Sequence, residues 1–414
     1  MLLEEGVLSE RLGGGIRLKY IVDVRLEEVR SAVKPPQNVT LTDDLDTAVQ
    51  DPEVDVIVEL IGGTTLARDL FERALKAGKN VVTANKALLA RHGDSLYRLA
   101  RENGCCIAFE GSVAGGIPVV GAVRDGLVGD RIESFYGILN GTCNYVLTRM
   151  LASDMPYDDA LAEAQRLGYA EADPTLDVEG HDSAHKLAVL ARLAFGLNVE
   201  LDDIPCEGIS KVELYDLKTT HAMGYTLKLL AVGQRQGNRI ELRVQPALLK
   251  HGHPMAAVSG VYNAVCVHGS QVGEVVLTGR GAGREPTASA VVADIARVAM
   301  GTYGEQFATL SQFGDVPDAK LVPHGEMTMR YYFRLDCQDQ PGILGSVAGI
   351  LGQEAISIAS VHQHEVAEKS GEHVPVVFMT HEAREAAMER ALRAINELDG
   401  VRGKHTRLLR VEDI

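Results

Sequence analysis

The sequence lacks the basic charge and the long apolar runs on which several large classes of protein depend. Its 57 acidic residues outnumber its 41 basic residues, and the net charge is −16 at pH 7. Nucleic acids and anionic membranes bind basic surfaces, so this balance argues against both as partners. No apolar run approaches the roughly 20 residues that span a bilayer. The acidic start, MLLEEGVLSE, does not resemble a signal peptide.

Cysteine motifs are also lacking. The six cysteines are scattered, and no two of them form a C-x-x-C pair. This spacing predicts neither a disulfide framework nor a zinc site. Reduced thiols are typical of the cytoplasm, where we expect this protein to be located. The residues are Cys105, Cys106, Cys143, Cys206, Cys266 and Cys337.

The first part of the chain alternates apolar, β-branched runs with helix-like stretches. Strands are predicted at 16–24, 55–63, 80–86 and 105–116, with helices between them. Apolar strands separated by helices indicate an α/β fold whose parallel sheet is covered on both faces. Ligands of such sheets bind at the carboxyl ends of the strands. These ends are Asp23, Gly62–Gly63, Thr83–Lys86 and Glu110–Gly116.

The remaining chain predicts two further domains. Residues 131–280 combine helices with several strand-like runs, the pattern of an α+β domain with a mostly antiparallel sheet. Residues 281–300 predict a helix, and 302–327, with glycine, proline and polar residues, predict a connection. The last segment has the order strand, helix, strand, strand, helix, strand, which is ferredoxin-like. The predicted domains are 1–113 (completed by about 280–320), 114–279 and 325–414.

The stretch ADPTLDVEGHDSAHKL (172–187) gathers several acids ahead of a lysine. An EF-hand aligned on Gly180 would need an acid first and a glutamate last, but Thr175 and Lys186 stand there. One interpretation is a solvated loop with an Asp182–Lys186 ion pair of about 0.3–0.5 kcal/mol. The other is an amino-acid site, because the acids outnumber the lysine and the apolar helix face predicts burial. Surplus carboxylates would bind a ligand ammonium group, and Lys186 would transfer a proton.

Five motifs occur in the order TANK (83–86), EGSVAGGIP (110–118), NGTCN (140–144), GYAEADPTLDVEGHDSAHKL (168–187) and GRGAGREPTASAVVAD (279–294). The ordered set resembles the homoserine dehydrogenase family, and DQPGILGSVAGIL near the C-terminus resembles the ligand turn of ACT domains. The resemblance implies a Rossmann-type domain that binds NADP or NAD. It implies interconversion of L-homoserine and L-aspartate 4-semialdehyde, in threonine, methionine and isoleucine biosynthesis. It also implies a homodimer or homotetramer whose ACT domain binds an amino acid, with L-threonine as the candidate.

The resemblance further implies roles for the acidic stretch and its partners. Asp182 would hold and polarise the reacting hydroxyl, Lys186 would pass its proton, and Lys86 would stabilise charge on the reacting oxygen or position the nicotinamide. Glu171 and Asp177 would bind the substrate amino group. The residues that would line the joint pocket are Asn140, Gly141 and Thr142.

Cofactor and metal sites are implied in the same way. Asp23 would bind an adenosine ribose, whereas Arg25 would accept a 2′-phosphate, so the choice between NAD and NADP stays open. The other implied cofactor residues are Gly62, Gly63, Thr83, Lys86, Gly281, Ala282 and Gly283. A sodium ion would be held, mostly through carbonyl oxygens, by Glu110, Val113, Gly115 and Ile117.

Several of these residues also have ordinary structural explanations. Lys86 could simply begin a helix, and Glu110 could cap the end of a strand. The NGT sequence at 140–142 is equally what a turn followed by a helix N-cap requires.

One family feature is missing from the sequence. Family members begin with a strand and a G-x-G-x-x-G loop, whose helix N-terminus holds the pyrophosphate. The GGG at 13–15 precedes a strand, whereas the fingerprint follows one. We expect the first strand and the phosphate loop to be absent, either because the start codon is placed too far downstream or because the chain is a natural fragment or pseudoenzyme. A chain that starts at Met1 is then expected to be poorly soluble or to bind NAD(P) weakly.

Two other functions compete with the dehydrogenase. A non-catalytic amino-acid sensor would combine the ACT domain with a scaffold that has lost its cofactor loop, but the intact Asp182 and Lys186 argue against it. Another amino-acid oxidoreductase could share the same domain plan. The DVEGHD motif followed by a lysine argues against that, since it suits a substrate amine next to a reacting alcohol.

Overall fold

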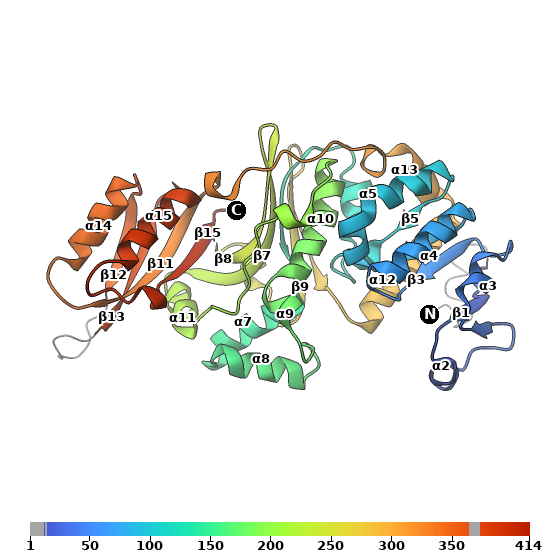
Figure 1. Cartoon of the computed structure of the whole chain (residues 1–414), viewed down its shortest axis with the longest axis horizontal. Coiled ribbons are helices and arrows are strands. Elements are labelled where there is room, and N and C mark those ends of the chain that lie inside the picture. The colour runs from blue at the N-terminus through green and yellow to red at the C-terminus, as the bar shows by residue number, and fades with distance from the viewer. Residues whose placement is uncertain (1–11, 13–14, 364–372) are drawn as a thin grey trace. The chain divides into compact units, whose positions relative to one another are not determined.

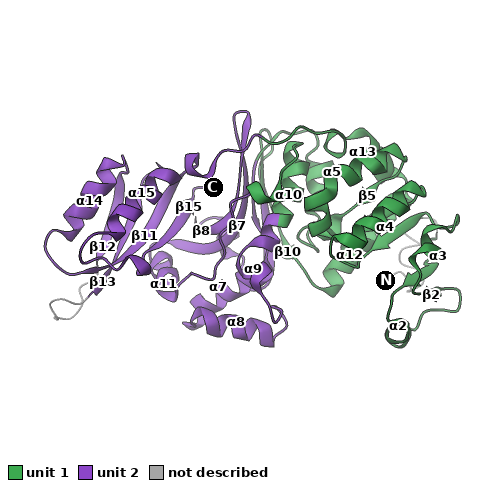
Figure 2. Cartoon of the chain, viewed as in Figure 1, with its two compact units in different colours: residues 1–133, 185–203, 267–319 green, residues 134–184, 204–266, 320–414 purple. Residues whose placement is uncertain are grey.

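The computed structural model describes residue 12 and residues 15–363 and 373–414. The chain forms two compact units (Figure 2). Unit 1 comprises residues 1–133, 185–203 and 267–319, and unit 2 comprises residues 134–184, 204–266 and 320–414. The expectations about the first strand and about Gly13 and Gly14 lie outside the described residues. The three domain boundaries drawn from the sequence stay a prediction.

Short parallel strands form the sheets of unit 1 (Figure 1). One sheet has the order β3 (Val56–Glu59), β4 (Asn80–Thr83), β5 (Ile107–Ala108), and a second pairs β1 (Tyr20–Val22) with β2 (Thr40–Thr42). Helices α4 (Thr65–Lys76) and α12 (Arg284–Ala299) both pack against β4. The valines of β4 are fully buried because helices cover the strand. The predicted parallel, Rossmann-like arrangement is therefore confirmed.

The other helices of unit 1 are α2 (Leu26–Val33), α3 (Leu45–Val49), α5 (Lys86–Glu102), α6 (Val119–Gly121) and α13 (Thr302–Thr309), and its last strand is β10 (Gly273–Arg280). The prediction of a connection from residue 302 onward is wrong for α13. Tyr303 and Phe307 lie one turn apart on this helix and are buried. The ring of Phe307 stacks on Phe313 with centroids 4.6 Å apart. Apolar packing therefore orders a stretch whose glycines predict a loop.

Unit 2 is built on one sheet with the order β6–β7–β8–β15–β11–β13–β12. Strands β7 (Tyr225–Gln236) and β8 (Arg239–Lys250) pair antiparallel along their whole length. The opposite edge of β8 pairs in parallel with β15, which places Arg410 beside Ala247. The remaining strands are β6 (Ile132–Ile138), β11 (Thr328–Gln338), β12 (Ile358–Gln363), β13 (His373–Thr380), β15 (Arg407–Glu412) and the two-residue β14 (Ala383–Arg384), which pairs with β11 outside this order.

The helices of unit 2 lie between these strands. They are α7 (Gly141–Ser153), α8 (Tyr157–Arg166), α9 (Thr175–Val178), α11 (Leu214–Ala222), α14 (Ile343–Gln353) and α15 (Glu385–Asn396). Helix α10 (His181–Phe195) and strand β9 (Tyr262–Gly269) each have residues in both units. Among the helices of the described residues, none is long and apolar enough to cross a membrane. All six cysteines lie in the described ranges and are free thiols, as predicted.

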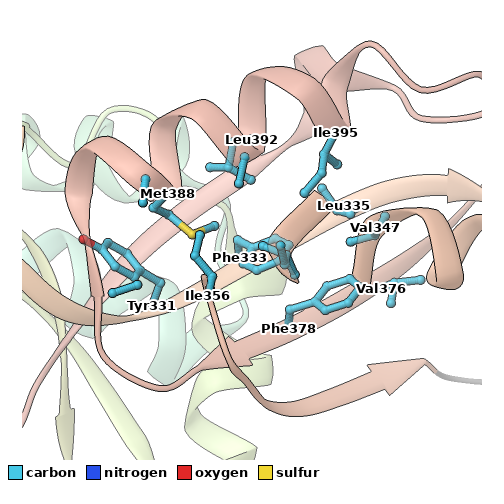
Figure 3. Packing of buried hydrophobic residues seen from close by; sticks show 14 of the residues in the cluster. Tyr331, Phe333, Leu335, Val347, Ile356, Val376, Phe378, Met388, Leu392 and Ile395 are labelled. Atoms are coloured by element: carbon cyan, nitrogen blue, oxygen red, sulfur yellow. The ribbon is translucent and has the colours of Figure 1, made fainter. Parts of the chain in front are cut away.

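The C-terminal part of unit 2 confirms the predicted ferredoxin-like order β11, α14, β12, β13, α15, β15. Figure 3 shows its core, where the apolar side chains of α15 face those of the sheet. Met388, Leu392 and Ile395 recur at helical spacing and form the apolar face of α15. Phe333 of β11 and Phe378 of β13 stack face to face, with centroids 4.7 Å apart. The apolar faces of α15 and α14 thus close this core against the paired strands β11 and β13.

Because Phe378 is buried against Phe333, Phe378→Ala should lower the free energy of unfolding by about 3–5 kcal/mol through lost burial and a residual cavity. Urea denaturation followed by circular dichroism measures this change. Leu344→Ala removes a side chain that is 41% exposed and serves as the control, with an expected change within about 0.5 kcal/mol. Equal effects of the two substitutions would contradict this description of the core.

Candidate active site

The turn before α7 brings two acids of the acidic stretch together. Asn140 is the N-cap of α7, and its side-chain oxygen accepts a hydrogen bond from the Cys143 N–H (2.8 Å). The amide nitrogen of the same side chain donates to Asp177 (2.7 Å) and to Asp182 (3.0 Å). Asn140 and Asp182 are buried, at 5% and 8% exposure, while Asp177 is half-buried. One amide therefore joins the helix start to both carboxylates.

The next residues of the same turn complete this cluster. The Thr142 hydroxyl donates to the Tyr169 carbonyl (2.5 Å) and lies 3.4 Å from an oxygen of Asp177. Gly141 approaches the chain closely, since a Cβ there would lie 2.8 Å from the Val261 carbonyl oxygen. The structure thus places Asn140 and Thr142 beside Asp177, with Gly141 between them in the chain, and the role of these three residues in a substrate pocket stays a prediction.

Not every predicted acid belongs to this cluster. Glu171 is exposed, and its backbone carbonyl accepts a hydrogen bond from the Gln165 side chain (3.1 Å). Asp173 accepts from both the N–H and the hydroxyl of Thr175, so it shapes the start of α9. The acids that accept from Asn140 are therefore Asp177 and Asp182, and the role of Glu171 stays a prediction.

Helix α10 carries the lysine that follows the acids. Asp182 is its second residue and Lys186 its sixth, and 3.6 residues per turn place them on one face. Lys186 is 7% exposed, as the apolar helix face predicts. Asp182 belongs to unit 2 and Lys186 to unit 1.

The strand ends of unit 1 are held together by a buried carboxylate. Glu59, at the end of β3, is fully buried and accepts hydrogen bonds from the Gly62 N–H (2.8 Å) and the Thr83 hydroxyl (2.8 Å). Asn85, the N-cap of α5, donates to the Gly63 carbonyl (2.8 Å). These bonds order the predicted glycine pair against the end of β4.

The first residue of α5 is Lys86, a half-buried residue that follows directly on this arrangement. Cations are disfavoured at a helix N-terminus, so this position is electrostatically unusual for a lysine with a purely structural role. An anionic or developing negative charge nearby would offset that disadvantage.

At the end of β1, Asp23 and Arg25 bind each other. The Asp23 carboxylate accepts from the backbone N–H of Arg25 (2.8 Å) and from its guanidinium Nε (3.4 Å). The backbone hydrogen bond from Arg25 is the main cause of a lowered pKa at Asp23. The Arg25 side chain is exposed and remains able to contact a ligand as well.

Two loops of unit 1 pack tightly on one another. A Cβ at Gly115 would lie 2.6 Å from the Gly281 carbonyl oxygen, and the Gly116 N–H donates to the Arg280 carbonyl (3.0 Å). Gly283 has a φ of 124°, which favours glycine there. The structure thereby brings the predicted cofactor loop 281–283 to the predicted metal loop 110–117.

The side chain of Glu110 has a structural role within this region. Its carboxylate accepts from the Val120 and Gly121 N–H groups (2.9 Å each) and from Arg297 (3.0 Å). The Glu110 N–H donates to Asp294 (2.6 Å), which is fully buried on α12. The Glu110 carboxylate thus accepts N–H groups at the start of α6 rather than capping a strand end, and its part in a metal site stays a prediction.

Comparison with known proteins identifies the family. Family models match residues 118–296 (homoserine dehydrogenase), 3–110 (homoserine dehydrogenase, NAD binding domain) and 331–400 (ACT domain). The homoserine dehydrogenase of Pseudomonas aeruginosa is 43% identical over 411 residues, 98% of this chain and 93% of that protein. The chain belongs to the homoserine dehydrogenase family.

Solved structures of homoserine dehydrogenases have the same fold. The crystal structure from Thiobacillus denitrificans matches with a TM-score of 0.90 at 39% identity, covering 98% of this chain and 92% of that one. A hyperthermophilic archaeal homoserine dehydrogenase in complex with NADPH matches with a TM-score of 0.57 at 28% identity, covering 66% of this chain and 82% of that one. The chain is thus an oxidoreductase with a Rossmann-like NAD(P)-binding domain, a sheet domain and an ACT domain.

Sequence reasoning missed two residues that order segments of the candidate site. Glu59 was hidden within an apolar strand, although a carboxylate just before a glycine pair was a signal of a buried polar contact. Gly208 lies far from every motif, yet a Cβ there would overlap the Val178 carbonyl and the Glu179 Cα. No local pattern marks Gly208, since the contact joins two distant segments.

The buried Asp294 makes a prediction about pH. Burial raises its pKa to about 7, against the lowering effect of the hydrogen bond from the Glu110 backbone. Between about pH 4 and pH 7, Asp294 therefore holds a proton in the folded enzyme that it has released in the unfolded chain. Because the folded state binds more protons, the free energy of unfolding falls as the pH rises through this window. Asp294→Asn cannot ionise, so its stability relative to the wild type should rise between pH 5 and pH 8.

Urea midpoints of the two proteins at both pH values measure this difference. Asp202→Asn, an exposed substitution in the same unit, is the control and should show a constant difference. A constant difference for Asp294→Asn as well would contradict the raised pKa.

Proposed function

We propose that the chain catalyses the NAD(P)-dependent interconversion of L-homoserine and L-aspartate 4-semialdehyde, a step of threonine, methionine and isoleucine biosynthesis. The main support is that the Asn140 amide donates to both Asp177 and Asp182. Asp182 lies four residues before Lys186, which is buried. This arrangement supplies both a site for an amino group and a proton-transfer group. Family membership supports the same reaction.

The substrate amino group is proposed to bind at Asp177. This half-buried carboxylate has Asn140 and Thr142 as neighbours. An ammonium group would form a charge-assisted hydrogen bond there. Glu171, exposed nearby in sequence, is proposed to add a second carboxylate when substrate is bound.

The chemistry at the C4 oxygen is proposed for three residues. Asp182 accepts a hydrogen bond from the substrate hydroxyl, and the Lys186 amine takes its proton during oxidation and returns it during reduction. Lys86 stabilises negative charge on the oxygen as the C–H bond breaks. The nicotinamide cofactor, when bound, supplies the hydride acceptor or donor.

The cofactor is proposed to lie along the strand ends of unit 1. Gly62 and Gly63, ordered by Glu59 and Asn85, leave room for close approach, and Thr83 and Lys86 follow on the next strand. The loop of Gly281, Ala282 and Gly283 adds a third glycine-containing surface. Asp23 would bind a ribose and Arg25 a 2′-phosphate. The NADPH complex of the archaeal relative supports the second arrangement.

A sodium site at Glu110, Val113, Gly115 and Ile117 is also proposed. Ala114 and Gly115 have positive φ values of 52° and 33°, so the loop turns sharply there. The loop is buried, and neutral carbonyl oxygens suit a small hard cation. The residues therefore fit such an ion through their carbonyls, since the Glu110 carboxylate already accepts three donors. A cytoplasmic location and a homodimer or homotetramer stay predictions from the sequence.

Turnover of homoserine tests the catalytic assignment. Lys186→Ala and Asp182→Ala should each lower kcat by about 10²–10⁴-fold, the typical contribution of a placed proton-transfer group. His181→Ala, at the exposed first residue of the same helix, should leave kcat near the wild-type value. Near-native turnover of either catalytic variant, with its fold intact by circular dichroism, would contradict the assignment. Absence of turnover in the wild type would favour the non-catalytic sensor.

The ACT domain is proposed to bind L-threonine at the turn before α14. Gly342 is the N-cap of α14 with a φ of 96°, and both Pro341 and Gly342 are exposed. The free N–H groups of the first helical turn and the positive end of the helix dipole favour a carboxylate at this position. An amino acid offers such a carboxylate together with a distinguishing side chain.

Calorimetric titration of the full chain with threonine, isoleucine and methionine tests this proposal. Heat with threonine is expected, and Gly342→Val should abolish it, because a β-branched residue resists the positive φ at this position. Binding of threonine that survives Gly342→Val would place the site elsewhere. Absence of heat with all three amino acids would leave the ACT domain a structural role.

A further inference from the structure

The segment around Glu207 and the ACT strand β15 share one edge of β8. The Val244 N–H donates to the Pro205 carbonyl (2.9 Å), and the Glu207 N–H donates to the Val244 carbonyl (2.8 Å). Three residues further along the same strand, Ala247 pairs with Arg410 of β15. Residues 205–207 and β15 therefore follow one another along the edge of β8, and Arg410 is the first residue of β15 that pairs with β8.

Arg410 joins the two segments through its side chain. Its guanidinium binds the Glu207 carboxylate at one nitrogen, and a second nitrogen donates to Glu385 (2.6 Å), the first residue of the ACT helix α15. Arg410 is 7% exposed and Glu385 is fully buried, whereas the Glu207 side chain is 41% exposed. A charged, largely desolvated contact thus connects the ACT domain to the segment that contains Glu207.

That segment is packed directly on the acidic loop. The Ile209 N–H donates to the Val178 carbonyl (2.7 Å), and the Cys206 thiol lies 3.3 Å from the Glu179 carbonyl. Gly208 leaves no room for a side chain against the same two peptide groups. Val178 follows Asp177 directly, so displacement of segment 205–209 would displace the Asp177 carboxylate.

We propose that Glu207 and Arg410 are positioning residues for substrate binding: Arg410 holds segment 205–209 against residues 177–180 and thereby keeps Asp177 in place for the substrate amino group. The inference rests on the proposed role of Asp177 and goes beyond it, because it makes the last strand of the ACT domain part of the support of the substrate site. A shift of α15 would reach Asp177 by the same contacts, through Glu385, Arg410 and Glu207.

A second ion pair on the same strand offers a matched control. Glu412 lies two residues after Arg410 on β15 and accepts a hydrogen bond from Arg243 of β8 (2.6 Å). Its side chain is only 7% exposed, so Glu412→Gln removes a more deeply buried carboxylate than Glu207→Gln does. The Glu412 carboxylate accepts from Arg243 and Gln245 of β8, outside segment 205–209, and its substitution therefore tests loss of stability without loss of positioning.

Steady-state kinetics of the full chain separates these effects. Glu207→Gln should raise KM for homoserine about tenfold, with kcat and the KM for the cofactor unchanged, since uniform substrate binding is lost. Arg410→Lys, which keeps a cation facing Glu385, should give a smaller rise. Glu412→Gln should leave KM for homoserine unchanged even if its urea midpoint falls. Equal KM values for Glu207→Gln and the wild type, or an equal rise in Glu412→Gln, would overturn the proposal.

Amide hydrogen exchange provides a readout that does not depend on activity. The peptide that contains Ile209, whose N–H is bound to Val178, should exchange faster in Glu207→Gln and not in Glu412→Gln. Unchanged exchange in Glu207→Gln would overturn the mechanical part of the proposal. If exchange changes as expected but the wild type does not turn over homoserine, the proposed function fails and the positioning contact stands.

Discussion

Two carboxylates can share a largely buried site only if donors offset their repulsion, and here one side chain donates to both. Asn140 donates to both Asp177 and Asp182, so each carboxylate has a donor that partly offsets their mutual repulsion. The same amide group also caps α7, so its oxygen fixes the helix start while its nitrogen fixes the acids. The turn, the helix and the acidic loop are therefore set relative to one another by the amide oxygen and amide nitrogen of a single side chain. A substrate with an ammonium group would further offset the negative charge of the two carboxylates.

The sequence predicted local features well because they depend on neighbouring residues. The α/β alternation, the ferredoxin-like order of the ACT domain and the burial of Lys186 follow from periodicity that reads directly from the chain. The grouping of Asn140 with Asp177 came instead from family resemblance, since 37 residues separate them. Contacts between residues so far apart in the chain are decided by tertiary packing. Hydrophobic periodicity predicts only local secondary structure and gives no information about them. The prediction of a connection from residue 302 was wrong for the same reason, because the aromatic rings that pack on Phe307 of α13 belong to other elements.

The role of polar groups in unit 1 was predictable only in part. Glycines at the strand ends indicated where the backbone approaches a ligand, but the group that orders them is Glu59, which is fully buried. Desolvating this carboxylate is costly unless several donors face it, and the donors come from residues 62 and 83. A sequence motif therefore indicates the residues at a ligand-binding surface. It does not indicate the buried contacts that support that surface.

The parallel pairing of β8 with β15 has a consequence for the chain as a whole. Leu248 and Leu249, fully buried, lie at the positions where β15 completes the hydrogen bonds of β8. A chain cut before β11 would expose this apolar stretch together with its unpaired backbone groups, and such an edge is a template for association with other strands. Removal of the ACT domain would thus lower the solubility of the rest of the chain. Truncations that remove it, whether by proteolysis or in the course of evolution, would have to cover the edge of β8 in another way.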